Sequence, residues 1–337
     1  WARPKSGGAL EDVRADVAVA LGCAKEEIAL SRGATEALQA LISGYNGLKP
    51  GDKVMYADLD YDSMQYAMNW LKERRGVEVI RFAIPEPATR ANVLAIYAEQ
   101  LKAHPTTKLL LLTHISHRTG LMLPVQEIAA MAKAAGADVI LDAAHSWGQV
   151  DYKVADLGVD FVGFNLHKWI GAPLGCGCLY IKASRLADID RHYGDEDFKA
   201  DDVRSRIHTG TMNFAATLSI PTALAVHREI GPSAKEARLR HLRDRWSKPA
   251  RDIKGLQILT PDDPTMAAGI TSFRFAGKTT PEANNAVVNA LRDQHGIMTV
   301  RRGGIAKGNA IRVTPSLFNT EADCDKLVAA LRAMAAA

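Results

Sequence analysis

Short aliphatic runs alternate with stretches of helical periodicity along most of the chain. A run that is apolar at every position predicts a strand buried on both faces of a sheet. The clearest such runs span residues 138–141, 159–165 and 176–181. Between the runs, apolar residues recur at helical spacing, for example over residues 90–103 and 124–135. This alternation predicts an α/β fold with a mostly parallel central sheet and helices on both faces, and we expect all three of these strands to be parallel.

The pattern changes after a long charged helix, which we expect at residues 233–252 as a solvated connector. Short strands and two more helices follow, which predicts a smaller α+β domain. These strands cover residues 256–259, 270–275 and 297–301, and the helices cover residues 281–293 and 323–334. We therefore divide the 337 residues into a large α/β domain, residues 1–230, and a small C-terminal domain, residues 231–337.

The composition argues against several classes of protein. With 47% hydrophobic and 24% charged residues, the chain is of the ordinary globular kind. A net charge of +4, without a stripe of Lys and Arg, does not favour nucleic acid as a partner, and no apolar stretch is long enough for a membrane. His114 and His117 lack acidic or thiol partners at suitable spacing, so we expect no metal. The four cysteines have no regular spacing, which predicts a reducing compartment and a cytoplasmic location.

A carboxylate and a lysine follow two of the predicted strands. Asp142 comes directly after the strand at 138–141, and Lys168 comes shortly after the strand at 159–165. Because ligands of parallel sheets bind beyond the carboxyl ends of the strands, both side chains should face one crevice. Enzymes that use pyridoxal phosphate need this pair. The lysine amine forms a Schiff base with the cofactor, and the carboxylate keeps the pyridine nitrogen protonated.

A glycine turn earlier in the chain is a candidate phosphate site. The strand at 28–30 leads through Gly33 into a helix that begins near Ala34 and Thr35. Free N–H groups and the helix dipole attract phosphate at such an end, and the Thr35 hydroxyl can add a donor. Without a ligand the same pattern is a plain helix start, which is its commoner meaning. No Gly-Lys-Ser/Thr follows, so the turn is not a nucleotide P-loop.

Two motifs in the centre of the chain resemble a known family. DAAH at residues 142–145 and NLHK at residues 165–168, followed by Gly171 and Pro173, are similar to motifs of class V aminotransferases, which have pyridoxal phosphate fold type I. Cysteine desulfurases, isopenicillin N epimerases and kynureninases belong to this family, and NLHKW is most similar to the isopenicillin N epimerase branch. The likeness extends over nearly the whole chain. It implies pyridoxal 5′-phosphate as the cofactor, bound by the lysine and the aspartate named above.

The resemblance also implies contacts to the rest of the cofactor. Tyr61 matches an aromatic ring that stacks on the pyridine, although a tyrosine packed at a loop edge is the alternative. His145 matches the residue that bonds the 3-oxygen. His117 stands where the family often has a small polar residue, so it lies either beside the substrate and that oxygen or on a surface loop. The implied phosphate contacts come from Gly33, Ala34, Thr35, Asn165 and His167.

Two positions in the C-terminal half match further motifs. GTMN at residues 210–213 resembles a turn that relatives give to the neighbouring subunit, so Thr211 is our candidate for a phosphate contact in a homodimer. The alternative is an ordinary helix cap. Arg312, on a predicted strand, matches the arginine that holds the substrate carboxylate through two parallel hydrogen bonds. It could instead pair with a surface acid, and Arg301 and Arg302 are secondary candidates for a distal acidic group.

Together the motifs predict an enzyme that acts at Cα of a small amino-acid substrate. Epimerisation and transamination both begin with loss of the Cα proton and both agree with the resemblance. A cysteine desulfurase is disfavoured, because such relatives place a nucleophilic cysteine after the motif matched by residues 300–303, and residues 305–308 contain none. A C–S lyase and a non-catalytic binding module of the same fold are the alternatives.

Overall fold

Seven strands form the central sheet, in agreement with the buried aliphatic runs. The computed structural model describes residues 2–336, with side chains described from residue 7 onward. In space the strands follow the order β1-β7-β6-β5-β4-β2-β3. Their bounds are Ile28–Ser31 for β1, Lys53–Ala57 for β2, Glu78–Phe82 for β3, Thr107–Thr113 for β4, Asp138–Asp142 for β5, Phe161–Asn165 for β6 and Gly177–Ile181 for β7.

Parallel pairing joins β2, β3, β4, β5 and β6, so the prediction of a mostly parallel sheet is confirmed. The prediction that residues 176–181 form a parallel strand is wrong, because β7 runs antiparallel to both β6 and β1. Only residues 166–176 connect β6 to β7, and they contain no helix. A parallel return needs a crossover of about a dozen residues or more, usually helical, whereas a short connection brings the chain back antiparallel.

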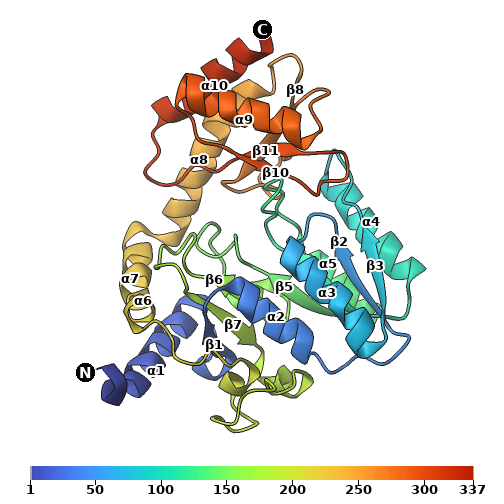
Figure 1. The fold of residues 1–337 in the computed structure, drawn as a ribbon, viewed down its shortest axis with the longest axis vertical. Coiled ribbons are helices and arrows are strands. Elements are labelled where there is room, and N and C mark those ends of the chain that lie inside the picture. The colour runs from blue at the N-terminus through green and yellow to red at the C-terminus, as the bar shows by residue number, and fades with distance from the viewer. Residues whose placement is uncertain (1, 337) are drawn as a thin grey trace.

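Alternate residues of each strand pack on opposite faces of the sheet. Leu109 and Leu111 of β4 face one core, and Leu110 and Leu112 face the other. The first core contains residues of α2 (Ala34–Gly44) and α3 (Asp62–Arg75), which lie on the viewer's side of the sheet in Figure 1. The second core contains residues of α1 (Ala2–Leu21), α4 (Arg90–Ala103), α5 (Val125–Ala134) and α7 (Ile220–Ile230); a short α6 (Phe214–Thr217) precedes α7. Helices on both faces are therefore confirmed.

A second sheet, of four antiparallel strands in the order β10-β11-β9-β8, forms the C-terminal part. Figure 1 shows it at the opposite end of the molecule from α1, with α8 running between the two parts. Its helices pack on it through one apolar core, so this part is the expected α+β arrangement. The division after residue 230 stays a prediction. The bounds are Pro232–Ala250 for α8, Leu256–Ile258 for β8, Thr271–Phe275 for β9, Pro281–His295 for α9, Val300–Arg302 for β10, Ala310–Val313 for β11 and Glu321–Ala336 for α10.

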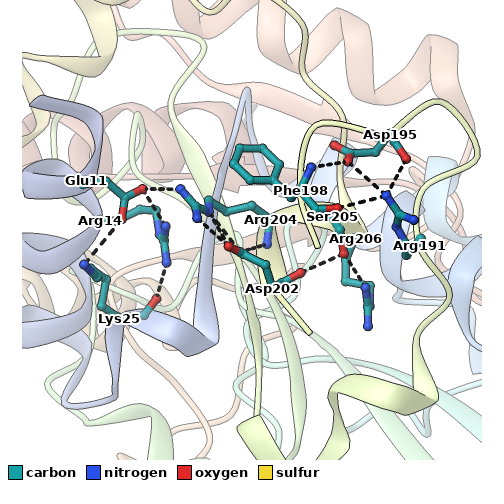
Figure 2. Close-up of polar contacts among 10 residues, drawn as sticks. All are labelled: Glu11, Arg14, Lys25, Arg191, Asp195, Phe198, Asp202, Arg204, Ser205 and Arg206. Carbon is teal, nitrogen blue, oxygen red and sulfur yellow. Dashed lines mark hydrogen bonds and ion pairs between the residues drawn. The ribbon is translucent and has the colours of Figure 1, made fainter. Parts of the chain in front are cut away.

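Ion pairs tie α1 to the charged segment that leads towards Thr211 (Figure 2). Arg204 contacts Glu11 of α1 at 2.8 Å and Asp202 at 2.9 Å, and its guanidinium lies 4.2 Å from the centre of the Phe198 ring. These side chains are partly exposed, so each ion pair contributes at most about 1 kcal/mol, and their joint effect is to fix the path of the loop. Among the described helices, none is long and apolar enough to cross a membrane.

Candidate active site

The carboxyl ends of β4, β5 and β6 open into a cavity of about 600 Å³. Thr113, Asp142 and Asn165 are the last residues of these strands, and all three line the cavity. Every candidate from the sequence except Thr211 lies on its wall, together with one of the secondary arginines. These lining residues are Gly33, Ala34, Thr35, Tyr61, His117, Asp142, His145, Asn165, His167, Lys168, Arg302 and Arg312.

Asp142 and Lys168 share this cavity without touching each other. Asp142 is buried, and its Oδ1 accepts a 2.9 Å hydrogen bond from the N–H of Ala144, while Oδ2 has no hydrogen-bond partner within residues 2–336. Burial raises the pKa of Asp142, and the Ala144 N–H and the Lys168 charge oppose this rise. Burial lowers the pKa of Lys168 to about 8, and the Asp142 charge opposes this fall. A neutral amine is therefore accessible close to neutral pH.

His145 connects Lys168 to the neighbouring tryptophan. Lys168 Nζ lies 3.0 Å from His145 Nε2, and Trp169 Nε1 donates to His145 Nδ1 at 3.4 Å. Burial holds the pKa of His145 well below its ordinary value, so the imidazole is neutral. Because an indole N–H can only donate, Nδ1 must accept and the single ring proton sits on Nε2. That proton can be given only to a neutral amine, which agrees with the lowered pKa of Lys168.

The turn from β1 into α2 is held open to the cavity by its neighbours. The N–H of Ala34 donates to Asn165 Oδ1 at 2.7 Å, which ties the first residue of α2 to the end of β6. A Cβ at Gly33 would come within 3.0 Å of that same oxygen, so glycine leaves the wall free at this point. The following N–H groups of the first helical turn have no acceptor within the helix. The Thr35 side chain makes no hydrogen bond to the described residues, and it lines the cavity beside those N–H groups.

Tyr61 and His117 meet at the side of the cavity. Their rings form an edge-to-face pair, with centres 5.2 Å apart and planes at 88°. His117 is buried, so the alternative of a surface-loop histidine is wrong. Burial, reinforced by the charges of Arg118 and Arg302, lowers the pKa of His117 to about 2, and the ring is therefore neutral. Tyr61 directly precedes α3, and 38% of its surface is exposed.

Two arginines of the small sheet complete the wall. Arg312, on β11, donates from Nη1 to the carbonyl oxygen of His117 at 3.0 Å. No carboxylate of the described chain pairs with Arg312, which removes the alternative of a surface ion pair. Arg302 also lines the cavity, whereas Arg301 binds Asn285 and Asn309 outside it. The structure thus distinguishes Arg302, which lines the cavity, from Arg301, which does not.

Thr211 lies apart from the other candidates. It lines a second cavity of about 590 Å³, next to the ion pairs of Figure 2. Glu11, Asp195 and Arg204 share this second wall with it. The backbone after Thr211 enters α6, where the neighbouring Asn213, and not Thr211, accepts the capping hydrogen bond from Ala216 at 3.2 Å. Within a single chain, Thr211 does not reach the cavity that holds Lys168.

Sequence reasoning missed a buried lysine behind the site. Lys235 of α8 donates from Nζ to the carbonyl oxygen of Trp169, the residue after Lys168. Lys235 is buried, so the prediction that this helix is simply a solvated face is wrong at this position. The residues next to Lys235 in the sequence do not predict its burial, because the loop that Lys235 contacts lies 66 residues away along the chain. Sequence reasoning also missed the hydrogen bond that Trp169 donates to His145. No group of metal ligands occurs among the described residues.

The comparison with known families decides the identity of this fold. The model of the family "Aminotransferase class-V" matches residues 4–327. The chain belongs to the class V aminotransferase family. Within it, the chain is 26% identical to the isopenicillin N epimerase of Streptomyces clavuligerus, over 96% of this chain and 84% of that protein. It is 28% identical to a cysteine desulfurase of Yersinia pestis (strain Pestoides F), over 96% of this chain and 82% of that protein.

A solved structure agrees with this assignment of the fold. The chain resembles a cystine C–S lyase, solved in complex with cysteine persulfide, with a TM-score of 0.84 and 22% identity over 98% of this chain and 88% of that one. The expected family and the pyridoxal phosphate fold type I are therefore confirmed. Class V membership identifies the protein as one of a family of pyridoxal 5′-phosphate enzymes, so pyridoxal 5′-phosphate is its cofactor.

The cavity fits this cofactor on chemical grounds. It offers a lysine amine with a lowered pKa, a buried carboxylate with one free oxygen and the open first turn of an 11-residue helix. These groups match an aldehyde, a pyridine nitrogen and a phosphate respectively. The glycine at the turn, Gly33, keeps the wall free of a Cβ where the phosphate would approach.

Proposed function

We propose that this protein removes the Cα proton of an amino-acid substrate, as the first step of either epimerisation or transamination. The observation that carries the proposal is that Lys168, Asp142 and Arg312 line one cavity. Two isopenicillin N epimerases are similar to this protein over nearly the whole chain. A fold of this family that only bound a partner would have no use for a half-buried arginine without an ion pair beside a lysine of lowered pKa.

Each residue has a role in this proposal. Pyridoxal phosphate, when bound, supplies an aldehyde that reacts with amines and a ring that accepts electrons. Lys168 would hold the cofactor through its amine, and as a free amine it would take the Cα proton of the substrate. Asp142 would stabilise a positive charge at the ring nitrogen, a preorganised interaction of the kind that contributes about 3 kcal/mol to lowering a barrier. Arg312 orients the substrate by gripping its α-carboxylate with a planar fork.

The remaining lining residues would hold the cofactor in place. The turn of Gly33, Ala34 and Thr35 would receive the phosphate. His145 and Tyr61 would bound the ring, one at its 3-oxygen and one at its face. Further polar contacts near the phosphate and the substrate would come from Asn165, His167 and His117.

A C–S lyase is the second candidate, because the chain is also 28% identical to cysteine desulfurases. The cavity wall carries no cysteine among the described residues, and Cys176, Cys178 and Cys324 are buried elsewhere. A reaction that transfers sulfur to a cysteine of the protein is therefore disfavoured, whereas release of sulfur directly into solution is not. All four cysteines are free, which is in keeping with a cytoplasmic location.

The proposed reaction can be tested with amino acids in deuterated water. We expect the purified holoenzyme to place deuterium at Cα of its substrate, and Lys168→Ala to lose both this exchange and the visible absorbance of the lysine-bound cofactor. Inverted configuration indicates an epimerase, and keto acid formed one-for-one with aminated cofactor indicates a transaminase. Pyruvate with released sulfur indicates the lyase. A Lys168→Ala protein that stays yellow and exchanges deuterium contradicts the assignment.

We also propose a homodimer in which Thr211 serves the neighbouring active site. The support is that Thr211 lies outside the cavity of its own chain, in a separate hollow beside Glu11 and Arg204. The test mixes subunits of two inactive variants, Lys168→Ala and Thr211→Val. If Thr211 acts across the interface, a mixed dimer holds one intact site and regains cofactor affinity that neither parent has. A monomer in sedimentation, or no recovery on mixing, contradicts the proposal.

A further inference from the structure

Two arginines of the small sheet project from the same face of neighbouring strands. In the antiparallel pair of β10 and β11, Val300 lies opposite Arg312 and Arg302 lies opposite Ala310. Because side chains alternate along a strand, Arg302 shares the face of Val300, which is also the face of Arg312. Diagonal neighbours in such a ladder are about 7–8 Å apart, so two flexible guanidinium groups can reach the two ends of one small ligand. Both side chains line the active-site cavity.

Neither arginine has its charge neutralised. Within the described residues, neither makes an ion pair, and the Nε of each is buried without a hydrogen-bond partner. The acids on the cavity wall do not pair with either arginine, since Glu36 pairs with Arg32 and Asp142 is assigned to the ring nitrogen of the cofactor. Burial lowers the pKa of Arg302, and burial together with the Arg302 charge lowers the pKa of Arg312 to about 10. The fold therefore holds two partly desolvated cations side by side, a cost that bound anions would offset.

The site has three places for an anion, whereas the cofactor phosphate and the α-carboxylate of a neutral amino acid fill only two. The first turn of α2 is open for the cofactor phosphate, and Arg312 is assigned to the α-carboxylate. Arg302 is left without an anion. A guanidinium offers a planar pair of donors that matches a second carboxylate.

We propose that the substrate is an amino acid whose side chain ends in a second carboxylate, and that Arg302 selects it. This inference rests on the proposed function, which gives the α-carboxylate to Arg312. Arg302 is then the specificity-determining residue of the site. A neutral side chain would leave the half-buried guanidinium of Arg302 unpaired, and sites built to bond a polar group reject analogues that lack it by large factors.

The neighbouring residue offers a matched control. Arg301 lies on the same strand and carries the same charge, but its side chain points to the opposite face. There Arg301 donates from Nε to Asn285 at 3.0 Å and from Nη1 to Asn309 at 2.7 Å. Removing its charge changes the net charge of β10 without changing the cavity wall.

The test measures ligand binding to the holoenzyme by calorimetry, separately from turnover. The ligands are glutarate, a dicarboxylate without a reactive amine, and its monocarboxylate counterpart pentanoate. We expect glutarate to bind at least about tenfold more tightly than pentanoate, and Arg302→Gln to abolish this preference by weakening glutarate alone. Arg301→Gln should leave both affinities within about twofold of the parent protein, and Arg302→Lys should retain part of the preference.

Two results overturn the inference: a parent enzyme that binds both ligands equally, or an Arg302→Gln protein that keeps its preference for glutarate. Deuterium exchange at Cα of glutamate and glutamine then separates the two proposals. If Arg302→Gln loses the glutarate preference but no amino acid exchanges deuterium, the inference about the site stands and the proposed reaction fails. If glutamine exchanges as fast as glutamate and glutarate is not preferred, the proposed reaction stands and the inference fails.

Discussion

At the scale of single residues, Lys168 shows how burial sets the reactivity of a side chain. Removing water from an ammonium favours the neutral amine, and the nearby Asp142 charge only partly reverses this, so the pKa falls to about 8. An ordinary lysine at pH 7 is neutral in about one molecule in 3,000, whereas a pKa near 8 raises this to about one in ten. The neutral His145, which can donate to the amine, is compatible with the same state.

The lowered pKa predicts how the apoenzyme captures its cofactor. The neutral amine is the nucleophile, so the rate of reaction with pyridoxal phosphate should rise with pH and reach half of its plateau near pH 8. Stopped-flow absorbance over about pH 6 to 11 measures this rate. A rate that is still climbing steeply at about pH 10, as for a lysine of ordinary pKa, would contradict this prediction.

At the scale of elements, the turn between β1 and α2 depends on a glycine of another strand. Gly177 begins β7, and a Cβ at this position would lie 2.4 Å from Gly33 Cα and 2.7 Å from the carbonyl oxygen of Phe164. Both contacts involve backbone atoms, which cannot move aside as a side chain can. The close approach lets the start of α2 reach Asn165, so the packing of β7 decides the position of the turn between β1 and α2.

We predict that Gly177→Ala lowers the free energy of unfolding by about 2 to 3 kcal/mol and weakens cofactor binding, because the turn must shift away from Asn165. Urea unfolding and cofactor titration measure the two effects. The control is Gly8→Ala in α1, where a Cβ meets no atom within 4 Å, and which should be neutral or stabilising by up to about 1 kcal/mol. Unchanged cofactor affinity in Gly177→Ala would show that the turn tolerates displacement.

At the scale of the whole molecule, one loop after β4 joins the two sheets. Arg118 is buried and donates to the carbonyl oxygen of Gly303 at 2.5 Å, and its Nη2 pairs with Asp62. The carbonyl oxygen of Arg118 accepts from the Ser272 hydroxyl at 2.7 Å. Gly120 approaches β9 so closely that a Cβ would lie 2.2 Å from the Ile270 carbonyl oxygen. The same loop carries His117, whose carbonyl oxygen holds Arg312, so the joint between the sheets is also a wall of the site.

We predict that Arg118→Met lowers the free energy of unfolding by about 2 to 3 kcal/mol, since it removes charge-assisted hydrogen bonds in a buried place. It should also raise KM, because Gly303 follows Arg302 and loses its anchor to the large sheet. Arg228→Gln, at an exposed position of α7, is the matched control and should change stability by less than about 0.5 kcal/mol. A stable Arg118→Met protein with unaltered KM would mean that other contacts hold the sheets together.

Sequence reasoning succeeded where function depends on a short contiguous stretch. Asp142 and Lys168 follow strands whose aliphatic character is local, and α2 begins where Gly33 predicted it. Sequence reasoning failed where the contacts of a residue come from distant parts of the chain. The direction of β7 follows from the route of its connection, and the burial of Lys235 follows from a loop 66 residues away.

The sequence by itself determined the order of strands and helices, the family motifs and the chemistry that the central residues can perform. These properties follow from periodicity and residue type over a few neighbouring positions. Only the tertiary structure decided that His117 is buried, that Arg302 and not Arg301 lines the active-site cavity, and that Thr211 lies outside the cavity of its own chain. Those properties depend on contacts such as the one between Arg118 and Gly303, which lie 185 residues apart, and on the pairing register of β10 and β11, which no local pattern encodes.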